Sequence, residues 1–453
     1  MDTIFNEFGV AMTRRNGYEL AQTLNPELSD DMLRLVYKTA NHASIKDLLK
    51  RHIRANTQHL PHVDLDEIQM WVDVFHCYWK TCGELLAIQD RSPKASWVKV
   101  YEAWKELFSA LHRGYMSPKV ELPAWTIPCL YIVGKYLRVF AMNADEERSN
   151  NPNQETTETN FQDDLDMEAD KFVWLRDCGV QLNRMFTLCL NDRANLMESR
   201  KWGIYNVANL LFKTYFKVKS PDLCKNVLRA IIAGRGDMPP FEAIPKSQRV
   251  IFKYYQGVLE FLDENYPQAE EHLTEAWNLC HKDALRNKEL ILTYLIPCHL
   301  VTTAKLPSAK LLEPYPRLQQ LFLPLCGAIK KGELHAFDLA LQEGEDEFVK
   351  RRIYLTLERG RDIALRNLCR RVFLAGGFEP PKEENAQPLR RTRVPLDEFV
   401  AAIRLGSQEK LDSDEVECLL ANQIYKGFMK GYISRPHNMV VLSKSGAFPP
   451  TGV

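Results

Sequence analysis

Hydrophobic residues recur at helical spacing through most of the chain, and most clearly over residues 253–281. This stretch predicts two short helices joined by a tight turn, with Pro267 in the first turn of the second, where a missing N–H is tolerated. Small residues alternate with large ones on the facing sides: Gly257, Ala269 and Ala276 against Tyr266 and Leu273. The alternation is typical of a tetratricopeptide-type hairpin, which needs neighbours stacked on it. Two ordinary helices of a globular bundle are the alternative.

The same periodicity extends over the first 380 residues, and no run with strand alternation comes before residue 390. We therefore predict a mostly α protein whose helical pairs stack as an α-solenoid. The expected organisation is an N-terminal helical region over residues 1–122 and a TPR-like solenoid over 123–380. A winged-helix part over 381–453 completes the chain.

One polar interruption falls inside the solenoid. Residues 144–170 hold ten acidic side chains and a single basic one, Arg148. Such a composition buries too little apolar surface to order itself, so we expect a flexible insertion there. An acidic binding tail is the alternative interpretation.

The last sixty residues change pattern. A short strand is predicted at residues 393–395, a short helix at 396–405, and a longer helix capped by Asp412 or Ser413. Alternating residues at 431–434 and 439–442 then predict a hairpin. A strand, two helices and a hairpin make a winged-helix domain. The acidic start of the long helix suits the helix dipole but repels phosphates, so reading of base sequence in the major groove is not expected.

Composition changes this picture little. The 59 basic and 59 acidic residues cancel, but residues 351–453 contain 17 Lys/Arg and 12 Asp/Glu, a net of +5, which leaves −5 for residues 1–350. The 11 cysteines are odd in number and form no C-x-x-C pair. We interpret them as reduced, buried thiols of a cytosolic or nuclear protein. Neither a signal peptide nor a membrane span is expected.

Motifs for catalysis are missing from the sequence. It contains no H-E-x-x-H, no G-x-S-x-G and no phosphate-binding G-x-x-x-x-G-K-[ST] loop, and its histidines are dispersed without metal-ligand spacing. Cys298 and His299 are isolated and near a proline. We therefore predict no enzymatic activity, no cofactor and no metal site, and we expect a scaffold.

Two candidate surfaces lie in the C-terminal part. The first is a basic series that consists of Arg390, Arg391, Arg393, Lys426, Lys430, Arg435 and Lys444. It is either a solvated face paired with local acids or a surface that contacts nucleic-acid phosphates. The second is the predicted hairpin, whose open edge invites pairing with a partner through Tyr432, Ile433, Val440 and Val441.

Several stretches make the chain resemble a known family. They are LRVFAMNAD at 137–145, SRKWGIYNVANLLFKTYFK at 199–217, QRVIFKYYQGVLEF at 248–261, NKELILTYLIP at 287–297, EVECLLANQIYKGFMKGYIS at 415–434 and AFPP at 447–450. The chain is similar to PCI-domain proteins of the family of COP9 signalosome subunit twelve, which also contains the PCI subunit of the TREX-2 mRNA-export complex. The resemblance covers residues 125–450 well and the first 120 loosely, and the acidic insertion departs from shorter members.

The resemblance implies a function. Family members are non-enzymatic, and the expected partners are a PCI protein of the Sac3/GANP type and the small acidic protein of the proteasome lid. Paired winged helices would form a basic platform for RNA or DNA, made in this chain by Lys426, Lys430, Arg435 and Lys444 with Arg390, Arg391 and Arg393 adjoining. The implied work is transcription-coupled mRNA export or splicing, in the nucleus and also the cytoplasm.

A second function class stays open at this point. The chain could be a protein-only scaffold, an accessory subunit of a COP9-signalosome-like complex in the neddylation and ubiquitin pathway. Its winged helix would then serve only to pair with another PCI subunit. Salt-dependent binding of a single-stranded oligonucleotide separates the two classes.

Overall fold

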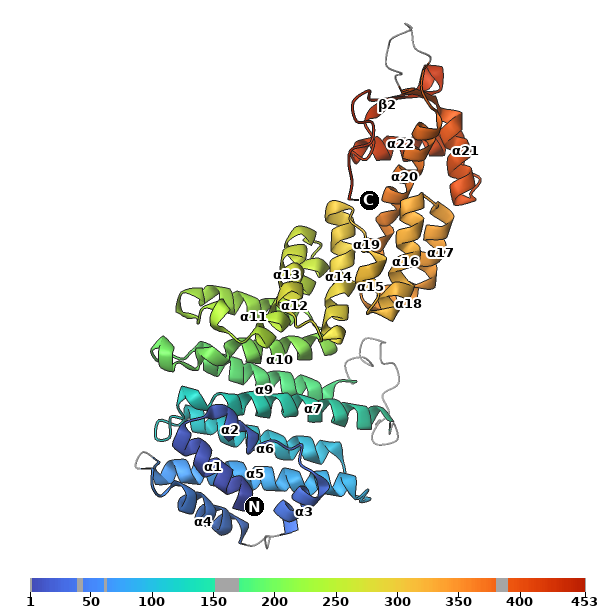
Figure 1. Ribbon diagram of the computed structural model, residues 1–453. Coiled ribbons are helices and arrows are strands. Elements are labelled where there is room, and N and C mark those ends of the chain that lie inside the picture. Colours follow the sequence, from blue (N-terminus) through green and yellow to red (C-terminus); the bar gives the residue numbers. More distant parts are fainter. Residues whose placement is uncertain (1, 39–43, 61–62, 151–170, 380–389, 453) are drawn as a thin grey trace, which may run out of the picture. The chain divides into compact units, whose positions relative to one another are not determined.

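The computed structural model describes residues 2–38, 44–60, 63–150, 171–379 and 390–452 (Figure 1). The chain divides into two compact units, Met1–Phe252 and Lys253–Val453, and each is described by itself. Among the described residues before 380, all named elements are helices, and the strands lie near the C-terminus. The predicted fold class, a helical solenoid followed by a winged helix, is confirmed. The domain boundaries predicted at 122 and 380 stay predictions.

The first unit is a stack of helices. Helix α5 packs on α6, α6 on α7, α7 on α9 and α9 on α10, and each helix contributes an apolar stripe to a shared core. Large side chains such as Trp71, Phe75, Trp104 and Phe108 are fully buried in it. The α-helices are α1 (Asp2–Arg14), α2 (Gly17–Gln22), α3 (Asp30–Lys38), α4 (Ile45–Thr57), α5 (Leu65–Gln89), α6 (Trp97–Met116), α7 (Pro128–Asn150), α9 (Val173–Leu190), α10 (Ile204–Lys217) and α11 (Asp222–Ala233). Short 3-10 helices connect them: η1 (Ala124–Thr126), η2 (Leu196–Glu198), η3 (Arg200–Gly203), η4 (Arg235–Asp237) and η5 (Phe241–Ala243).

The end of α7 corrects the start predicted for the acidic insertion. The helix runs to Asn150, so residues 144–150 are part of the stack, and 151–170 lie outside the described residues. The Asp145 carboxylate accepts hydrogen bonds from the N–H groups of Trp174 and Leu175, at 3.0 and 2.9 Å. Glu147 accepts from the N–H of Trp97 at 2.7 Å. These acids satisfy unpaired N–H groups at the starts of α9 and α6, a role that a composition count does not detect.

The second unit begins within α12 (Lys246–Leu262) and is also built mainly of helices. Its further helices are α13 (Tyr266–Leu279), α14 (Leu285–Thr303), α15 (Ala309–Leu312), α16 (Pro316–Lys331), α17 (Leu334–Glu343), α18 (Glu345–Lys350), α19 (Tyr354–Glu358) and α20 (Gly360–Ala375). The hairpin predicted over residues 253–281 is formed by α12 and α13. Leu273 is fully buried, as predicted, whereas Trp277 is only partly buried because its ring faces outward to Lys288, whose Nζ lies 3.8 Å from the ring centroid.

The winged helix closes the second unit. It consists of β1 (Arg393–Pro395), α21 (Leu396–Ser407), α22 (Ser413–Tyr425), β2 (Gly431–Ser434), the 3-10 helix η6 (Arg435–His437) and β3 (Met439–Leu442). The antiparallel sheet has the order β1-β3-β2, so β3 is the central strand. The predicted cap of the long helix is a capping box, in which the Asp412 carboxylate accepts the N–H of Glu415 at 2.7 Å and the Glu415 carboxylate accepts the N–H of Asp412 at 2.8 Å.

The C-terminal tail is fastened to the last helix of the stack. Arg366 on α20 is almost fully buried and donates from Nη2 to the carbonyl of Pro449 at 2.6 Å. The Phe373 and Phe448 rings pack with their centroids 5.7 Å apart. The N–H of Lys430 also donates to the Ala447 carbonyl at 2.7 Å. The tail therefore ties the winged helix to α20.

The cysteines are free, and ten of them are buried, as predicted. Only Cys418 is exposed. Among the described helices, none is long and apolar enough to cross a membrane.

Candidate nucleic-acid and partner interface

The seven predicted cations all lie on the winged helix or on the segment that leads into it. Antiparallel register places three of them at one end of the small sheet. Arg393 pairs with Val441 at the start of β1, and the Lys430 carbonyl accepts the Ser443 N–H at 2.9 Å. Lys444 follows directly. Arg393, Lys430 and Lys444 are exposed, and no ion pair joins them to any residue that the structure describes.

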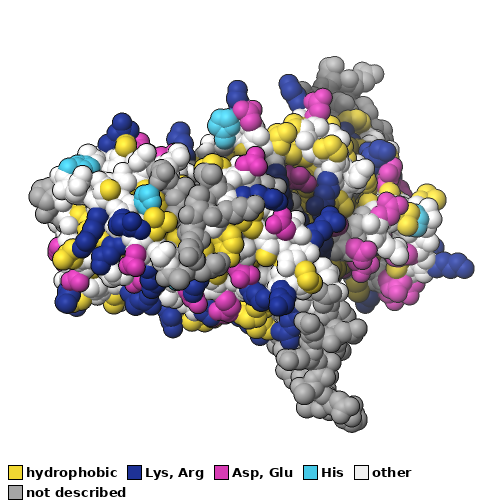
Figure 2. All heavy atoms as spheres, turned by 90° about the horizontal axis from the view of Figure 1, so that it is seen from below, with side chains coloured by type: hydrophobic (Ala, Val, Ile, Leu, Met, Phe, Trp, Pro, Cys, Tyr) yellow, Lys and Arg dark blue, Asp and Glu magenta, His cyan; other side chains and the backbone are white. Residues whose placement is uncertain are grey.

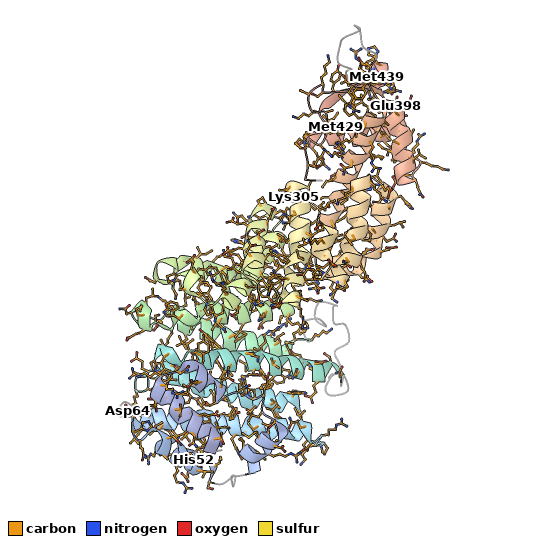
Figure 3. The ribbon with its side chains drawn as sticks, viewed as in Figure 1. His52, Asp64, Lys305, Glu398, Met429 and Met439 are labelled. Atoms are coloured by element: carbon orange, nitrogen blue, oxygen red, sulfur yellow. The ribbon has the colours of Figure 1, made fainter. Side chains whose placement is uncertain are left out.

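Three other predicted cations are neutralised by acids of the same chain. Lys426 pairs with Asp362 on α20 at 2.6 Å, and Arg391 pairs with Glu398 on α21 at 3.1 Å. Glu398 is labelled in Figure 3, on the winged helix with Met439 of β3. Each pair removes one positive charge from the field that a phosphate would meet. Because partly exposed pairs contribute only about 0–1 kcal/mol, their role is in local charge rather than in stability.

Arg435 lies at the opposite end of the sheet, in η6 after β2. Its Nε is 2.9 Å from the Glu417 carboxylate, and its Nη2 is 3.7 Å from Asp414. The acidic start of α22, which the sequence indicated as unfavourable for phosphates, is therefore the partner of Arg435. This end of the sheet carries no excess of positive charge from Arg435.

Arg390 is used in packing. Its guanidinium lies 4.6 Å from the ring centroid of Phe378 and 5.5 Å from that of Phe373. It also donates to the Leu374 carbonyl at 3.2 Å. The predicted series thus divides into an exposed basic end of the sheet, which we call the basic sheet end (Arg393, Lys430 and Lys444), and four residues with other tasks.

Charge is mixed on the face that Figure 2 draws. On the face drawn in Figure 2, Lys and Arg side chains are interspersed with Asp and Glu and do not gather in one field. This face therefore offers no continuous basic field to a phosphate backbone.

The predicted partner residues are not equivalent. Tyr432 on β2 is 62% exposed and Ile433 is half-buried. Val440 was predicted to contact a partner, and the structure corrects this prediction. Its side chain is fully buried, because it belongs to the central strand and faces the core with Val394 of β1. Val441 is half-buried between Arg393 and Tyr432. Among the described strands, nothing pairs with the outer edge of β2, so the open edge belongs to β2 alone in this hairpin.

Candidate chemistry elsewhere is weak. In the described parts of the chain, no group of three or more His, Cys, Asp or Glu residues could hold a metal ion. Burial raises the pKa of the Cys298 thiol to about 12, which disfavours the nucleophilic thiolate. The adjacent His299 has its Nδ1 2.9 Å from the Glu270 carboxylate rather than near a nucleophile. Residues 298 and 299 are therefore best explained as part of the helical core and its surface.

The sequence alone does not identify the acids that divide the basic series. Asp362 lies 64 positions before Lys426, on a different helix, and no periodic signal connects them. Glu417 and Arg435 are closer in sequence, but only the packing of η6 beside α22 brings them together.

Fold and surface together define a class: a helical-repeat protein that ends in the winged helix of a PCI domain. Residues 348–444 match the PCI domain. Over their whole lengths, the chain and Protein CSN12 homolog of Neurospora crassa are 62% identical. Protein CSN12 homolog of Schizosaccharomyces pombe is 36% identical over 84% of this chain and 83% of its own length. PCI domain-containing protein 2 of Danio rerio is 32% identical over 78% of this chain and 79% of its own length.

These similarities confirm the resemblance expected from the sequence. The chain belongs to the family of PCI-domain proteins that contains the CSN12 homologs and PCI domain-containing protein 2.

Proposed function

We propose that this protein is a non-enzymatic PCI scaffold subunit that pairs with a second PCI protein and contacts nucleic acid through the basic sheet end. The partners would be a Sac3/GANP-type PCI protein and the small acidic protein of the proteasome lid. The complex would act in transcription-coupled mRNA export or splicing, in the nucleus and also the cytoplasm. The observation that carries the proposal is the basic sheet end, whose three exposed cations form no ion pair with a described residue, on a sheet whose β2 edge is open.

The number of cations in the basic sheet end determines the expected affinity for nucleic acid and its dependence on salt. Each phosphate contact with duplex DNA contributes a slope of about −0.9 to the dependence of log affinity on log salt. On a single strand, where each contact contributes about −0.7, Arg393, Lys430 and Lys444 together would give a slope of about −2, so the isolated subunit should bind weakly at physiological salt. A second basic winged helix, placed beside the β2 edge, would add contacts and raise the affinity. No base specificity is expected, because backbone charge carries no sequence information.

The test compares two variants with the same net charge. R393Q/K430Q/K444Q removes the unpaired cations, and the control R391Q/K426Q/R435Q removes the cations that are already in ion pairs. Fluorescence anisotropy with a single-stranded RNA over a range of salt should show weaker binding and a flatter slope for the first variant only. Both should retain the helical circular-dichroism spectrum. Equal binding by the parent and both variants would contradict the nucleic-acid part of the proposal.

Pairing through β2 is tested separately. An exposed strand edge offers unpaired N–H and C=O groups to a second chain, and charge placed on it opposes such pairing. Tyr432→Asp should therefore weaken co-purification with the partner PCI protein, whereas Tyr425→Asp, at an even more exposed tyrosine of α22, should not. Retained co-purification of Tyr432→Asp would place the interface away from this edge.

One observation favours the second function class. Because Lys426, Arg391 and Arg435 are in ion pairs, the basic surface is smaller than the sequence indicates. A protein-only scaffold, an accessory subunit of a COP9-signalosome-like complex in the neddylation and ubiquitin pathway, needs only the β2 edge. That class is favoured if the partner is retained while R393Q/K430Q/K444Q binds RNA as the parent does.

A further inference from the structure

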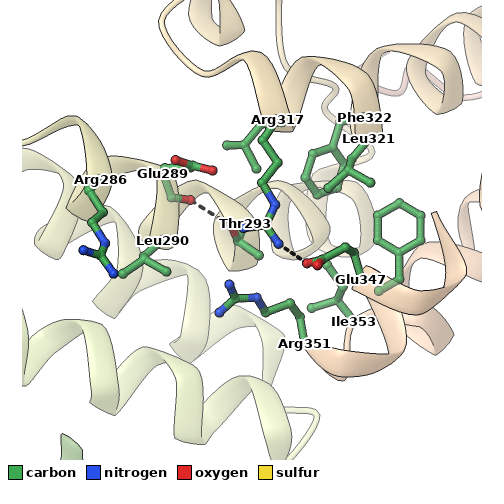
Figure 4. Close-up of a pocket in the computed structure, with 12 residues that line it drawn as sticks. Arg286, Glu289, Leu290, Thr293, Arg317, Leu321, Phe322, Glu347, Arg351 and Ile353 are labelled. Carbon is green, nitrogen blue, oxygen red and sulfur yellow. Dashed lines mark hydrogen bonds and ion pairs between the residues drawn. The ribbon is translucent and has the colours of Figure 1, made fainter.

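The helical part of the second unit contains a polar pocket that has no role in the function proposed above. It measures about 270 Å³ and lies between the start of α14, the start of α16 and the segment from α18 to α19 (Figure 4). Its floor is apolar, because Leu318, Phe322, Phe348 and Ile353 are buried there.

Three arginines surround this floor, one from each segment: Arg286, Arg317 and Arg351. The Arg317 guanidinium forms an ion pair with Glu347, so that pair is neutral. No ion pair joins Arg286 or Arg351 to any residue in the described ranges. Two guanidinium groups of the pocket are therefore available to a ligand.

Glu289 also lines the pocket, and its place determines where an anion fits. In Figure 4 the Arg286 guanidinium lies to the left of Thr293 and the Arg351 guanidinium below it, while the Glu289 carboxylate lies above both guanidinium groups. The Thr293 hydroxyl donates to the backbone carbonyl of Glu289 at 2.8 Å and is already satisfied. The space between Arg286 and Arg351 is thus the electropositive part of the pocket.

Two of the arginines occupy positions that are unfavourable for a cation. Arg286 is the second residue of α14 and Arg317 the second of α16. The helix dipole places partial positive charge in the first turn, which disfavours basic side chains there. An anion bound in the pocket would relieve this repulsion.

We propose that the pocket binds the dianionic head of a phosphate monoester between Arg286 and Arg351. The planar guanidinium matches phosphate oxygens with two parallel hydrogen bonds, and a monoester carries about −1.5 to −2 charges at pH 7. A volume of 270 Å³ is at the small end for ligand sites, which suits a head group and its first carbon atoms rather than a whole cofactor. Leu290 and Leu321 would contact those carbons.

The same chemistry can be supplied by a free small phosphate or by a phosphorylated side chain of a partner protein. Calorimetric titration of the full chain at constant ionic strength distinguishes the two sources. The probes are inorganic phosphate, N-acetyl-phosphoserine amide and N-acetyl-aspartate amide. Tighter binding of the phosphoserine probe supports a monoester whose carbons contact the pocket, and equal or tighter binding of inorganic phosphate would mean that the pocket holds a free phosphate ion instead of an ester. Equal binding of the aspartate probe, or no binding of either phosphate, would overturn the proposal.

Two double variants test whether the phosphate probe binds in this pocket. R286Q/R351Q should lose at least tenfold in affinity for the phosphate probe. The control K350Q/R352Q removes two exposed charges of the same segment that do not line the pocket, and it should bind as the parent does. Affinity should also fall below about pH 6, where the dianion of the monoester takes up a proton and becomes a monoanion.

The melting temperature of each variant in a chloride buffer shows whether the variant folds. The quantity compared between variants is the rise in melting temperature when phosphate is added. Equal loss in both variants would mean a non-specific charge effect and would refute the site. Loss of oligonucleotide binding in R286Q/R351Q would likewise refute it, because the arginines would then belong to a nucleic-acid surface. The phosphate site does not rest on the proposed nucleic-acid function, so one of the two proposals can be wrong while the other holds.

Discussion

The close approach of α12 and α13 gives a quantitative prediction about the hairpin. Gly257 faces Leu273, and a Cβ added at Gly257 would lie 2.7 Å from Leu273 Cγ and 3.0 Å from Cδ2. Leu273 is fully buried. Leu273→Ala should therefore lower the free energy of unfolding by about 2–5 kcal/mol, through lost burial and the cavity that is left.

The reverse change tests the same contact. Gly257→Ala brings a methyl group into the space of Leu273 and costs about 1–3 kcal/mol by overpacking, partly offset by about 1 kcal/mol from better helix propensity. In the double variant the new methyl group enters the cavity left by Leu273. The combined loss should thus be smaller than the sum of the single losses, with an interaction energy of about 1 kcal/mol or more.

The assay is equilibrium urea unfolding followed by far-ultraviolet circular dichroism, with the same slope required for all four proteins. The matched control is Leu290→Ala combined with Gly257→Ala, because Leu290 is half-buried on α14 and the atoms nearest to a Cβ at Gly257 belong to Leu273 and Ala269. Its losses should be additive within about 0.5 kcal/mol. Additivity of Gly257→Ala and Leu273→Ala would refute the close packing. A loss below about 0.5 kcal/mol for Leu273→Ala would mean that its face is exposed.

Further predictions concern single side chains. Cys418 should react with a thiol reagent much faster than the other ten cysteines in the native protein, and unfolding should release all 11; fast reaction of a second thiol would contradict the buried core. Glu147→Ala should cost about 1 kcal/mol in urea unfolding, because the N–H of Trp97 loses its acceptor; no change would mean that α6 begins without this cap. Burial raises the pKa of Asp145, so the folded state binds this proton more tightly than the unfolded chain. The contribution of Asp145 to the free energy of unfolding should be greatest below its pKa in the unfolded chain, about 3.9, and should fall as the pH rises through its pKa in the folded protein. Asp145→Asn should flatten this pH dependence when unfolding is measured over a series of acidic pH values.

Much of the fold was determined locally by the sequence. Helical periodicity, the proline at the start of α13 and the capping residues of α22 depend on neighbours within a few positions, so they identify helices without tertiary information. The alternation at 431–434 and 439–442 likewise identified the hairpin of the winged helix. It did not show that β3 is central, because the pairing with β1 joins residues more than forty positions apart.

The candidate surfaces were decided by tertiary structure. The sequence identified seven cations, but which of them remain available depends on acids such as Asp362 and Glu398, which packing brings within ion-pair distance. The acids at the end of α7 were assigned to an insertion by composition, yet Asp145 and Glu147 bind the starts of other helices. Coulomb attraction and hydrogen bonding act over a few ångströms of space, whatever the separation along the chain, so only the folded arrangement determines which charges meet.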